Sequence, residues 1–293
     1  MTVLEPVRFA LYASLGLAFG VPAAAVLTRA QAGLGRLRPL LAGTVLAALP
    51  LSLIGYLLAV AEMAGSSLRD LDWQLVFALA TGSAFGWAFL ARVAALGLAA
   101  ILCIAMPRRL VWLAVPAAIA LATLAWAGHA GVGEGAQGLL RLAGDIVHLL
   151  AASIWLGALA LFVALLWRPD SGPGAVADAL ARFAGVGSVV VVTLGVTGLA
   201  NIWFLAGPGS WLGLVTSDYG LLLAGKLALF GSMLALAALN RFVLVPRLLA
   251  SATHRDEAQA LARLKLSIGA ELGAACAVLL VVARLGMIDP GTM

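Results

Sequence analysis

Charged residues are scarce in this sequence. Asp, Glu, Lys and Arg make up only 11% of the 293 residues, whereas 63% of the residues are hydrophobic. A soluble globular domain has about a quarter charged residues and about half apolar ones. The shortage of charge excludes an ordinary soluble domain. The net charge of +5 does not indicate a nucleic-acid partner, because the basic residues do not gather on a soluble face.

Cysteine pairs and the common catalytic motifs are missing as well. Cys103 and Cys276 each lie inside an apolar run without a nearby partner, so neither a disulfide framework nor a Cys-x-x-Cys metal site is indicated. The chain has no Walker A sequence, no Gly-x-Gly-x-x-Gly between a strand and a helix, and no His-Glu-x-x-His. No Ser/His/Asp arrangement is evident. We therefore do not expect an enzyme.

Long apolar runs fill most of the chain instead. Runs of about twenty residues cross about 30 Å of hydrocarbon as helices, and they predict an all-α integral membrane protein with a bundle of about eight transmembrane helices. Residues 73–82 are apolar too and suggest an interfacial or re-entrant segment. No linker interrupts the pattern, so residues 1–293 are expected to form a single polytopic membrane domain. The predicted spans are 7–30, 39–63, 83–106, 109–127, 140–167, 179–206, 219–246 and 265–287.

Basic and acidic residues fall on opposite sides of this predicted bundle. The loops after the first, third, fifth and seventh spans hold 12 of the 18 basic residues: Arg29, Arg36, Arg38, Arg108, Arg109, Arg168, Arg182, Arg241, Arg247, Arg255, Arg263 and Lys265. The other side has eight acidic residues: Glu5, Glu62, Asp70, Asp72, Glu134, Asp145, Asp218 and Asp289. Because Lys and Arg concentrate in cytoplasmic loops, both termini are predicted to be periplasmic. An acidic outer side would also attract cations.

Three charged residues, Arg92, Lys226 and Glu271, lie inside the predicted spans and away from their ends. Such residues are rare, usually face the bundle interior, and either pair with a polar group or take part in function. Lys226 is seven residues below the outer end of its span, about 10 Å at 1.5 Å per residue, and Arg92 has a similar depth. Glu271 enters from the cytoplasmic side, which places it nearer to Asn240 and Arg241.

The stretch "AGDIVHLLAASIWLGAL" (143–159) sets ionisable groups into an apolar run. Asp145, His148 and Trp155 follow one another at spacings of three and seven residues, which places them on one helical face. His129 lies at the outer end of the preceding span. A short outer loop joins these two spans, so both histidines are expected in the outer leaflet of one helical hairpin.

Imidazole at this position is a candidate metal ligand. Neutral histidine is the commonest metal ligand and suits copper as well as zinc. Asp145 would either orient His148 or bind the metal directly. Met63 and Met287 also fall at outer helix ends and could add thioether ligands. The alternative is structural: each histidine is hydrogen-bonded to a neighbouring carbonyl or carboxylate.

Several motifs in the second half resemble the copper resistance protein D (CopD) family of bacterial inner-membrane proteins. They cover residues 127–290, whereas the earlier spans match the family in hydropathy and number. In order along the chain they are "AGHAG" (127–131), "DIVHLLAASIWLGAL" (145–159), "RFAGVGSVVVVTLGVTGLANIW" (182–203), "SDYGLLLAGKLALFGSMLALAALNRFVLVPRL" (217–248) and "ELGAACAVLLVVARLGMIDP" (271–290).

This resemblance implies an eight-span protein of the bacterial inner membrane, in contact with membrane lipid, that moves copper ions from periplasm to cytoplasm. A small periplasmic copper-binding protein is an implied partner. His129 and His148 become the implied copper contacts. The other motif positions have no implied role: Trp155, Tyr219, Lys226, Asn240 and Glu271. The chain has only six methionines and no Met-x-x-Met cluster in the membrane, so a histidine and carboxylate site fits better than a methionine-lined path.

Three hypotheses remain at this point. A copper permease would take Cu⁺ or Cu²⁺ at the histidine site and pass it through an interior lined by Asn201, Asn240 and Glu271. A membrane redox protein would use His129 and His148 as axial ligands of a b-type haem. A scaffold or sensor would dock a periplasmic copper protein without transporting the ion.

Overall fold

The computed structural model describes residues 3–106, 109–127, 135–167, 173–206 and 217–288. Within these ranges every regular element is a helix, which confirms the predicted all-α class. The elements are α1 (Leu4–Leu27), η1 (Gln31–Leu37), α2 (Arg38–Met63), η2 (Leu68–Asp70), α3 (Trp73–Gly82), α4 (Ala84–Ala105), η3 (Leu110–Leu113), α5 (Ala114–Ala122), η4 (Thr123–Ala127), α6 (Gly135–Leu166), α7 (Pro173–Ala206), α9 (Asp218–Leu239), η6 (Asn240–Leu244), α10 (Val245–Leu249) and α11 (His254–Leu285).

Seven helical segments among the described residues are long and apolar enough to cross a membrane: Leu4–Leu27, Leu34–Met63, Ala84–Ala105, Gly135–Leu166, Val176–Phe204, Asp218–Leu249 and His254–Leu285. The remaining predicted span, 109–127, forms the shorter apolar segment Leu110–Trp126. It consists of α5 between two 3₁₀ turns, η3 and η4. Because a 3₁₀ turn rises about 2.0 Å per residue rather than 1.5 Å, this segment reaches further than an α-helix of equal length.

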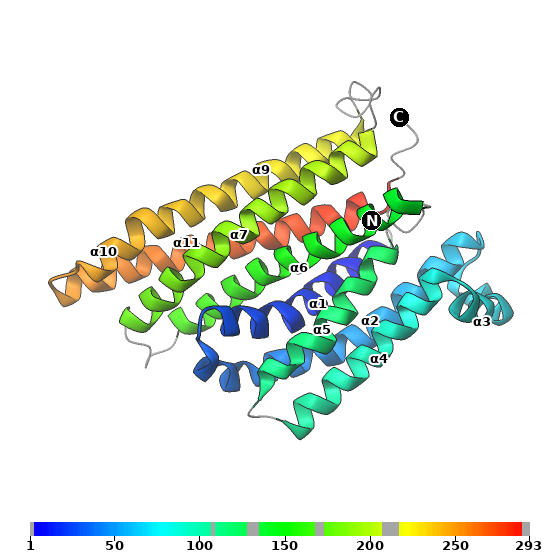
Figure 1. The fold of residues 1–293 in the computed structure, drawn as a ribbon, viewed down its shortest axis with the longest axis horizontal. Coiled ribbons are helices and arrows are strands. Elements are labelled where there is room, and N and C mark those ends of the chain that lie inside the picture. Colours follow the sequence, from blue (N-terminus) through cyan, green and yellow to red (C-terminus); the bar gives the residue numbers. More distant parts are fainter. Residues whose placement is uncertain (1–2, 107–108, 128–134, 168–172, 207–216, 289–293) are drawn as a thin grey trace.

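The helices lie side by side in an elongated bundle with α6 at its centre (Figure 1). One side of α6 packs against α1, which in turn contacts α2 and α5; α4 covers α2 and α5. The other side of α6 packs against α7 and α11, and α9 rests on α11. Residues far apart in sequence, on α6, α7, α9 and α11, are therefore brought together in one half of the bundle.

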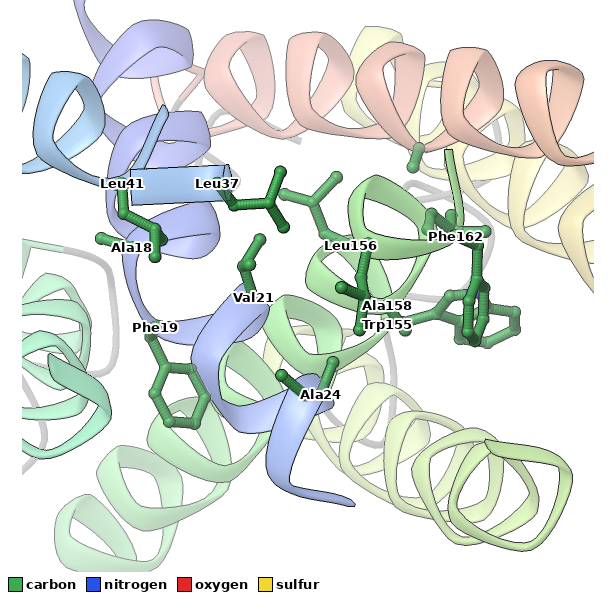
Figure 2. Packing of buried hydrophobic residues seen from close by; sticks show 14 of the residues in the cluster. Ala18, Phe19, Val21, Ala24, Leu37, Leu41, Trp155, Leu156, Ala158 and Phe162 are labelled. Carbon is green, nitrogen blue, oxygen red and sulfur yellow. The ribbon is translucent and has the colours of Figure 1, made fainter. Parts of the chain in front are cut away.

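The contact between α1 and α6 depends on small residues. Gly20 faces the Ser153 carbonyl and Gly157 so closely that a Cβ at Gly20 or at Gly157 would overlap backbone atoms of the other helix. Gly16 lies one turn earlier, against Ser153 and Leu156. Small residues four apart let two membrane helices approach closely and gain van der Waals contact. Figure 2 shows the apolar side chains gathered around this contact.

The first and last helices are tied together at one end of the bundle. Arg8 on α1 donates a hydrogen bond to the Gly286 carbonyl at 2.6 Å, and Arg284 on α11 forms an ion pair with Glu5. Gly16 contacts Ser153, and Gly20, four residues later on α1, contacts Gly157, four residues later on α6. The two helices therefore run parallel. The beginning of α6 therefore lies at the same end as the beginning of α1.

Several helices begin earlier than the predicted spans, and the last helix does so by the largest margin. The last helix begins at His254, well before residue 265, because the Thr253 side chain caps it by accepting a hydrogen bond from the Asp256 amide at 3.1 Å. Hydropathy detects only the apolar part of such a helix. The apolar segment before the third long helix is a separate helix, α3, which is capped by Asp72 and breaks from α4 at Ser83, whose backbone is extended.

The helix that begins at Asp218 changes its winding near its end. Residues Asn240–Leu244 form a π-helical turn, η6, followed by α10 with Pro246 near its start. Proline has no amide hydrogen, and its ring clashes with the carbonyl four residues earlier in a regular α-helix. A wider turn before Pro246 relieves that clash.

Candidate functional site

Polar contacts link α6 to α7 at three successive levels. Arg141 donates to the Phe204 carbonyl and its guanidinium lies over the Phe204 ring, 5.0 Å from the centroid. One turn further, Asn201 donates to Asp145 Oδ1 at 2.6 Å. The next level pairs His148 Nδ1 with Thr197 Oγ1 at 2.8 Å. We call these three pairs the polar ladder: Arg141–Phe204, Asp145–Asn201 and His148–Thr197.

The helical repeat explains why these residues meet. Along α6 the ladder residues are spaced by four and then three positions. Their partners on α7 are spaced by three and then four positions in the reverse chain direction. Each set therefore lies on one helical face, and the two faces meet between antiparallel helices. Two glycines lie beside the ladder side chains, but neither is needed for the helices to approach, because a methyl group would fit at both positions. A Cβ added at Gly144 would lie 3.9 Å from Asn201 Oδ1, and one added at Gly198 would lie 3.9 Å from His148 Cε1.

The hydrogen bonds fix which His148 nitrogen carries the proton in the neutral ring. Thr197 Oγ1 donates its single hydrogen to the Thr193 carbonyl at 2.6 Å, so it can only accept from His148. Nδ1 must then be protonated, which leaves the Nε2 lone pair available. Among the described residues, no other side chain is hydrogen-bonded to this ring. A histidine held by Nδ1–H and open at Nε2 has the arrangement of a metal ligand.

Two side chains of α9 lie near the ladder. Lys226 is close enough to interact electrostatically with both His148 and Asp145, and Tyr219 interacts in the same way with Asp145. The Asp145 carboxylate therefore accepts a hydrogen bond from an amide and lies within electrostatic range of a phenol and an ammonium group. The structure thus gathers five of the predicted site residues around one position: Asp145, His148, Asn201, Tyr219 and Lys226.

Two other candidate metal ligands, His129 and Met63, are not placed with His148. His129 lies outside the described residues. Met63 ends α2, is 65% exposed, and α2 packs against α1 and α4 rather than in the half of the bundle that contains α7. Within the described ranges, no group of three or more His, Cys, Asp or Glu side chains could hold a metal ion. His148 and Asp145 alone are therefore too few for a metal site among these residues.

A second polar group is buried further along α6. The Trp155 indole N–H donates to Glu271 Oε1 at 2.8 Å, and the Asn240 amide donates to Glu271 Oε2 at 3.1 Å. The expected proximity of Glu271 to Asn240 is confirmed, whereas Arg241 turns away and donates to α7 at Ser188 and the Ala184 carbonyl. Trp155 is therefore hydrogen-bonded to Glu271 and is not part of the polar ladder.

Arg92 lies in the other half of the bundle. Its Nε donates to Thr123 Oγ1 at 2.8 Å and its Nη2 to the Thr123 carbonyl at 3.2 Å. Both residues are buried, and the bonds join α4 to η4. These bonds give the buried guanidinium two hydrogen-bond acceptors. They also give a donor to the Thr123 carbonyl, at the point where α5 ends and the 3₁₀ turn η4 begins.

Sequence reasoning missed Thr197, which pairs with His148, and Ser267, whose buried and unpaired hydroxyl lies one turn before Glu271. Thr197 precedes Asn201 by four residues, so the two share a helical face just as Asp145 and His148 do on the preceding span. The Thr197 and Asn201 pair on the span after His148 could therefore have indicated a polar contact between the two spans. Ser267 precedes Glu271 by four residues on α11, but nothing in its local sequence distinguishes it from other serines in apolar helices.

Comparison with known proteins identifies the family. A family model described as "Copper resistance protein D" matches residues 177–285, and one described as "Copper resistance protein D-like, N-terminal domain" matches residues 2–139. Copper resistance protein D from Pseudomonas syringae pv. tomato is 37% identical over 304 residues, which cover 97% of this chain and 96% of that protein. The chain belongs to the copper resistance protein D family. The resemblance seen in residues 127–290 is thereby confirmed and extends through the first half.

A second relative is more distant. Inner membrane protein YebZ from Escherichia coli (strain K12) is 28% identical over 228 residues, covering 74% of this chain and 72% of that protein. No solved structure matches the chain. Membership of the copper resistance protein D family gives the chain a role in copper handling. Together with the seven apolar helices of the described ranges, it makes the chain a multi-pass protein of the inner membrane.

Proposed function

We propose that this protein carries copper ions across the inner membrane from periplasm to cytoplasm and takes them up at His148. The observation that carries the proposal is the His148–Thr197 hydrogen bond, which leaves Nε2 of a neutral ring available as a ligand. Asp145 supplies a carboxylate on the same helical face one turn away. His129, from the preceding "AGHAG" motif, is proposed as the second imidazole.

Electrostatics supports inward movement. The predicted periplasmic side carries eight acidic residues, which would raise the local concentration of cations. An inside-negative membrane potential favours inward transfer by about 2.3 kcal/mol per charge per 100 mV. From His148 the ion would pass into the half of the bundle formed by α6, α7, α9 and α11. Copper is the transported substrate here, and no resident cofactor is proposed.

Copper accumulation by cells tests the proposal. The His148→Ala variant should lose copper-dependent uptake while remaining folded in the membrane, because no other described side chain replaces its Nε2. His254→Ala is the matched control, since His254 is the exposed first residue of α11, and it should keep normal uptake. Unchanged uptake by His148→Ala would exclude His148 as the copper ligand.

The absorption spectrum and metal content of the purified protein separate the other hypotheses. A copper carrier should bind copper without a Soret band. A Soret band that disappears in His148→Ala would instead identify a haem protein. Copper binding without uptake by the wild type would identify a scaffold or sensor.

A further inference from the structure

Glu271 is a buried carboxyl with no cationic partner in the part of the chain that the structure describes. It is 3% exposed, and among the described residues no Lys, Arg or His side chain is within ion-pair distance of it. Its contacts are the neutral N–H groups of Trp155 and Asn240. An isolated ionised carboxylate in an apolar interior carries a large desolvation cost. Two neutral hydrogen bonds reduce that cost but do not supply a positive charge.

Among the described residues, two of the buried side-chain oxygens that lack a hydrogen-bond partner are relevant to this carboxyl: one belongs to a residue bonded to it and the other to a residue four positions before it. Asn240 Oδ1 and Ser267 Oγ are both buried and unpaired, and their residues are 5% and 7% exposed. The Asn240 amide already donates to Glu271, so its oxygen lies at the carboxyl. Ser267 lies one turn before Glu271 on the same face of α11. Helical hydroxyls commonly donate to a carbonyl four residues earlier, as Ser52 does at 2.6 Å, but Ser267 does not.

The winding of the neighbouring helix presents Asn240 to this position. Asn240 is the first residue of the π-helical turn η6, which precedes Pro246. Such turns rearrange the backbone hydrogen bonds and recur at functional sites. Asn240 of η6 and Glu271 of α11 are therefore hydrogen-bonded here, Ser267 lies one turn away on the same helix face as Glu271, and no positively charged partner accompanies them among the described residues.

We propose that Glu271, Asn240 and Ser267 form a binding site for a hard monovalent cation, H⁺ or Na⁺. A proton on the carboxyl would neutralise it and provide a donor for an unpaired oxygen, while Na⁺ would take the same oxygens as ligands. Cu⁺ does not suit this set, because it prefers sulfur and imidazole ligands. The site contacts α6 at Trp155, seven residues further along than His148 and about 10 Å deeper, so the two sites are separate.

The charged groups on the surrounding helices are engaged elsewhere. Arg241 on η6 binds α7. On α9, Lys226 interacts with the ladder residues Asp145 and His148 of α6. Arg8 and Glu5 of α1 bind Gly286 and Arg284 at the end of the bundle, and Lys265 of α11 lies over the Trp167 ring, 5.7 Å from its centroid. None of these charged side chains forms an ion pair with Glu271.

The test uses the full-length protein in lipid vesicles without copper, so that its result is independent of the transport proposal. In sodium-free buffer, infrared absorption should show a protonated-carboxyl band that Glu271→Gln removes. Dicyclohexylcarbodiimide, which reacts with protonated carboxyls in apolar surroundings, should form an adduct at Glu271. Band and adduct should both decline as the pH is raised. Glu62→Gln, which removes an exposed carboxyl, should leave both signals unchanged.

Sodium chloride, compared with potassium chloride at equal ionic strength, identifies the cation. Loss of the band and adduct on adding sodium would establish a Na⁺ site, and no effect of sodium would establish a proton site. The proposal is overturned if wild type and Glu271→Gln give the same carboxyl band at every pH and no sodium dependence. Glu271 would then be a permanently ionised hydrogen-bond acceptor. Infrared absorption does not require reagent access, so the band decides the question if labelling and absorption disagree.

Discussion

Thr197 has a defined chemical task at the level of single residues. By donating to the Thr193 carbonyl and accepting from His148, it fixes the ring orientation and leaves Nε2 free. The sequence indicated that Asp145 and His148 share a face, because helical spacing is simple geometry. It did not indicate that Thr197 would hold the ring, because that depends on the register between α6 and α7.

Removing the Thr197 hydroxyl should therefore weaken copper binding without unfolding the protein. Loss of a hydrogen-bond partner of a ligating histidine costs about 10–100-fold in metal affinity, and we expect a decrease of that order in Thr197→Val. Copper titration of the purified protein measures it. Thr193→Val, one turn earlier on α7, is the control and should bind normally. Equal affinity in Thr197→Val and wild type would mean that Thr197 does not support the ligand.

At the level of helices, two features position the polar groups. Gly20 and Gly157 bring α1 onto α6, and Pro246 is preceded by the π-helical turn that carries Asn240. The spans themselves were predictable from apolar run length. The helix-to-helix contacts were not, because most membrane helices contain glycine and only the packing shows which glycines face another backbone.

A methyl group at Gly20 should destabilise the protein. The new Cβ would overlap the Ser153 carbonyl, so α1 and α6 would have to separate, and overpacking of this kind costs about 1–3 kcal/mol. Thermal unfolding in detergent should show a lower midpoint for Gly20→Ala. Gly97→Ala is the matched control, because a Cβ there meets nothing within 4 Å. An unchanged midpoint in Gly20→Ala would show that this contact does not limit stability.

At the level of the whole molecule, the chain separates into two halves around α6. One half contains α1, α2, α4 and α5, and the other contains the ladder and the buried carboxyl cluster of Trp155, Asn240 and Glu271. The all-α class and the family followed from hydropathy and motifs. The segment 109–127 was the least regular of the predicted spans, because its ends adopt 3₁₀ turns that apolar composition does not reveal.

The orientation of the bundle remains a prediction from charge. Basic residues in the odd-numbered loops place both termini in the periplasm. Alkaline phosphatase, which is active only in the periplasm, should therefore be active when fused after Met293 and inactive when fused after Ser251. The opposite pattern would reverse the proposed direction of transport.

Copper uptake by the purified protein in liposomes tests the central claim most directly. With an imposed inside-negative potential, copper should enter wild-type vesicles faster than empty ones, and the rate should rise with the potential because the ion carries positive charge. His254→Ala should behave like wild type, and His148→Ala should reduce the rate to that of empty liposomes. Wild-type vesicles that take up no more copper than empty ones, or equal uptake through His148→Ala, would contradict the account.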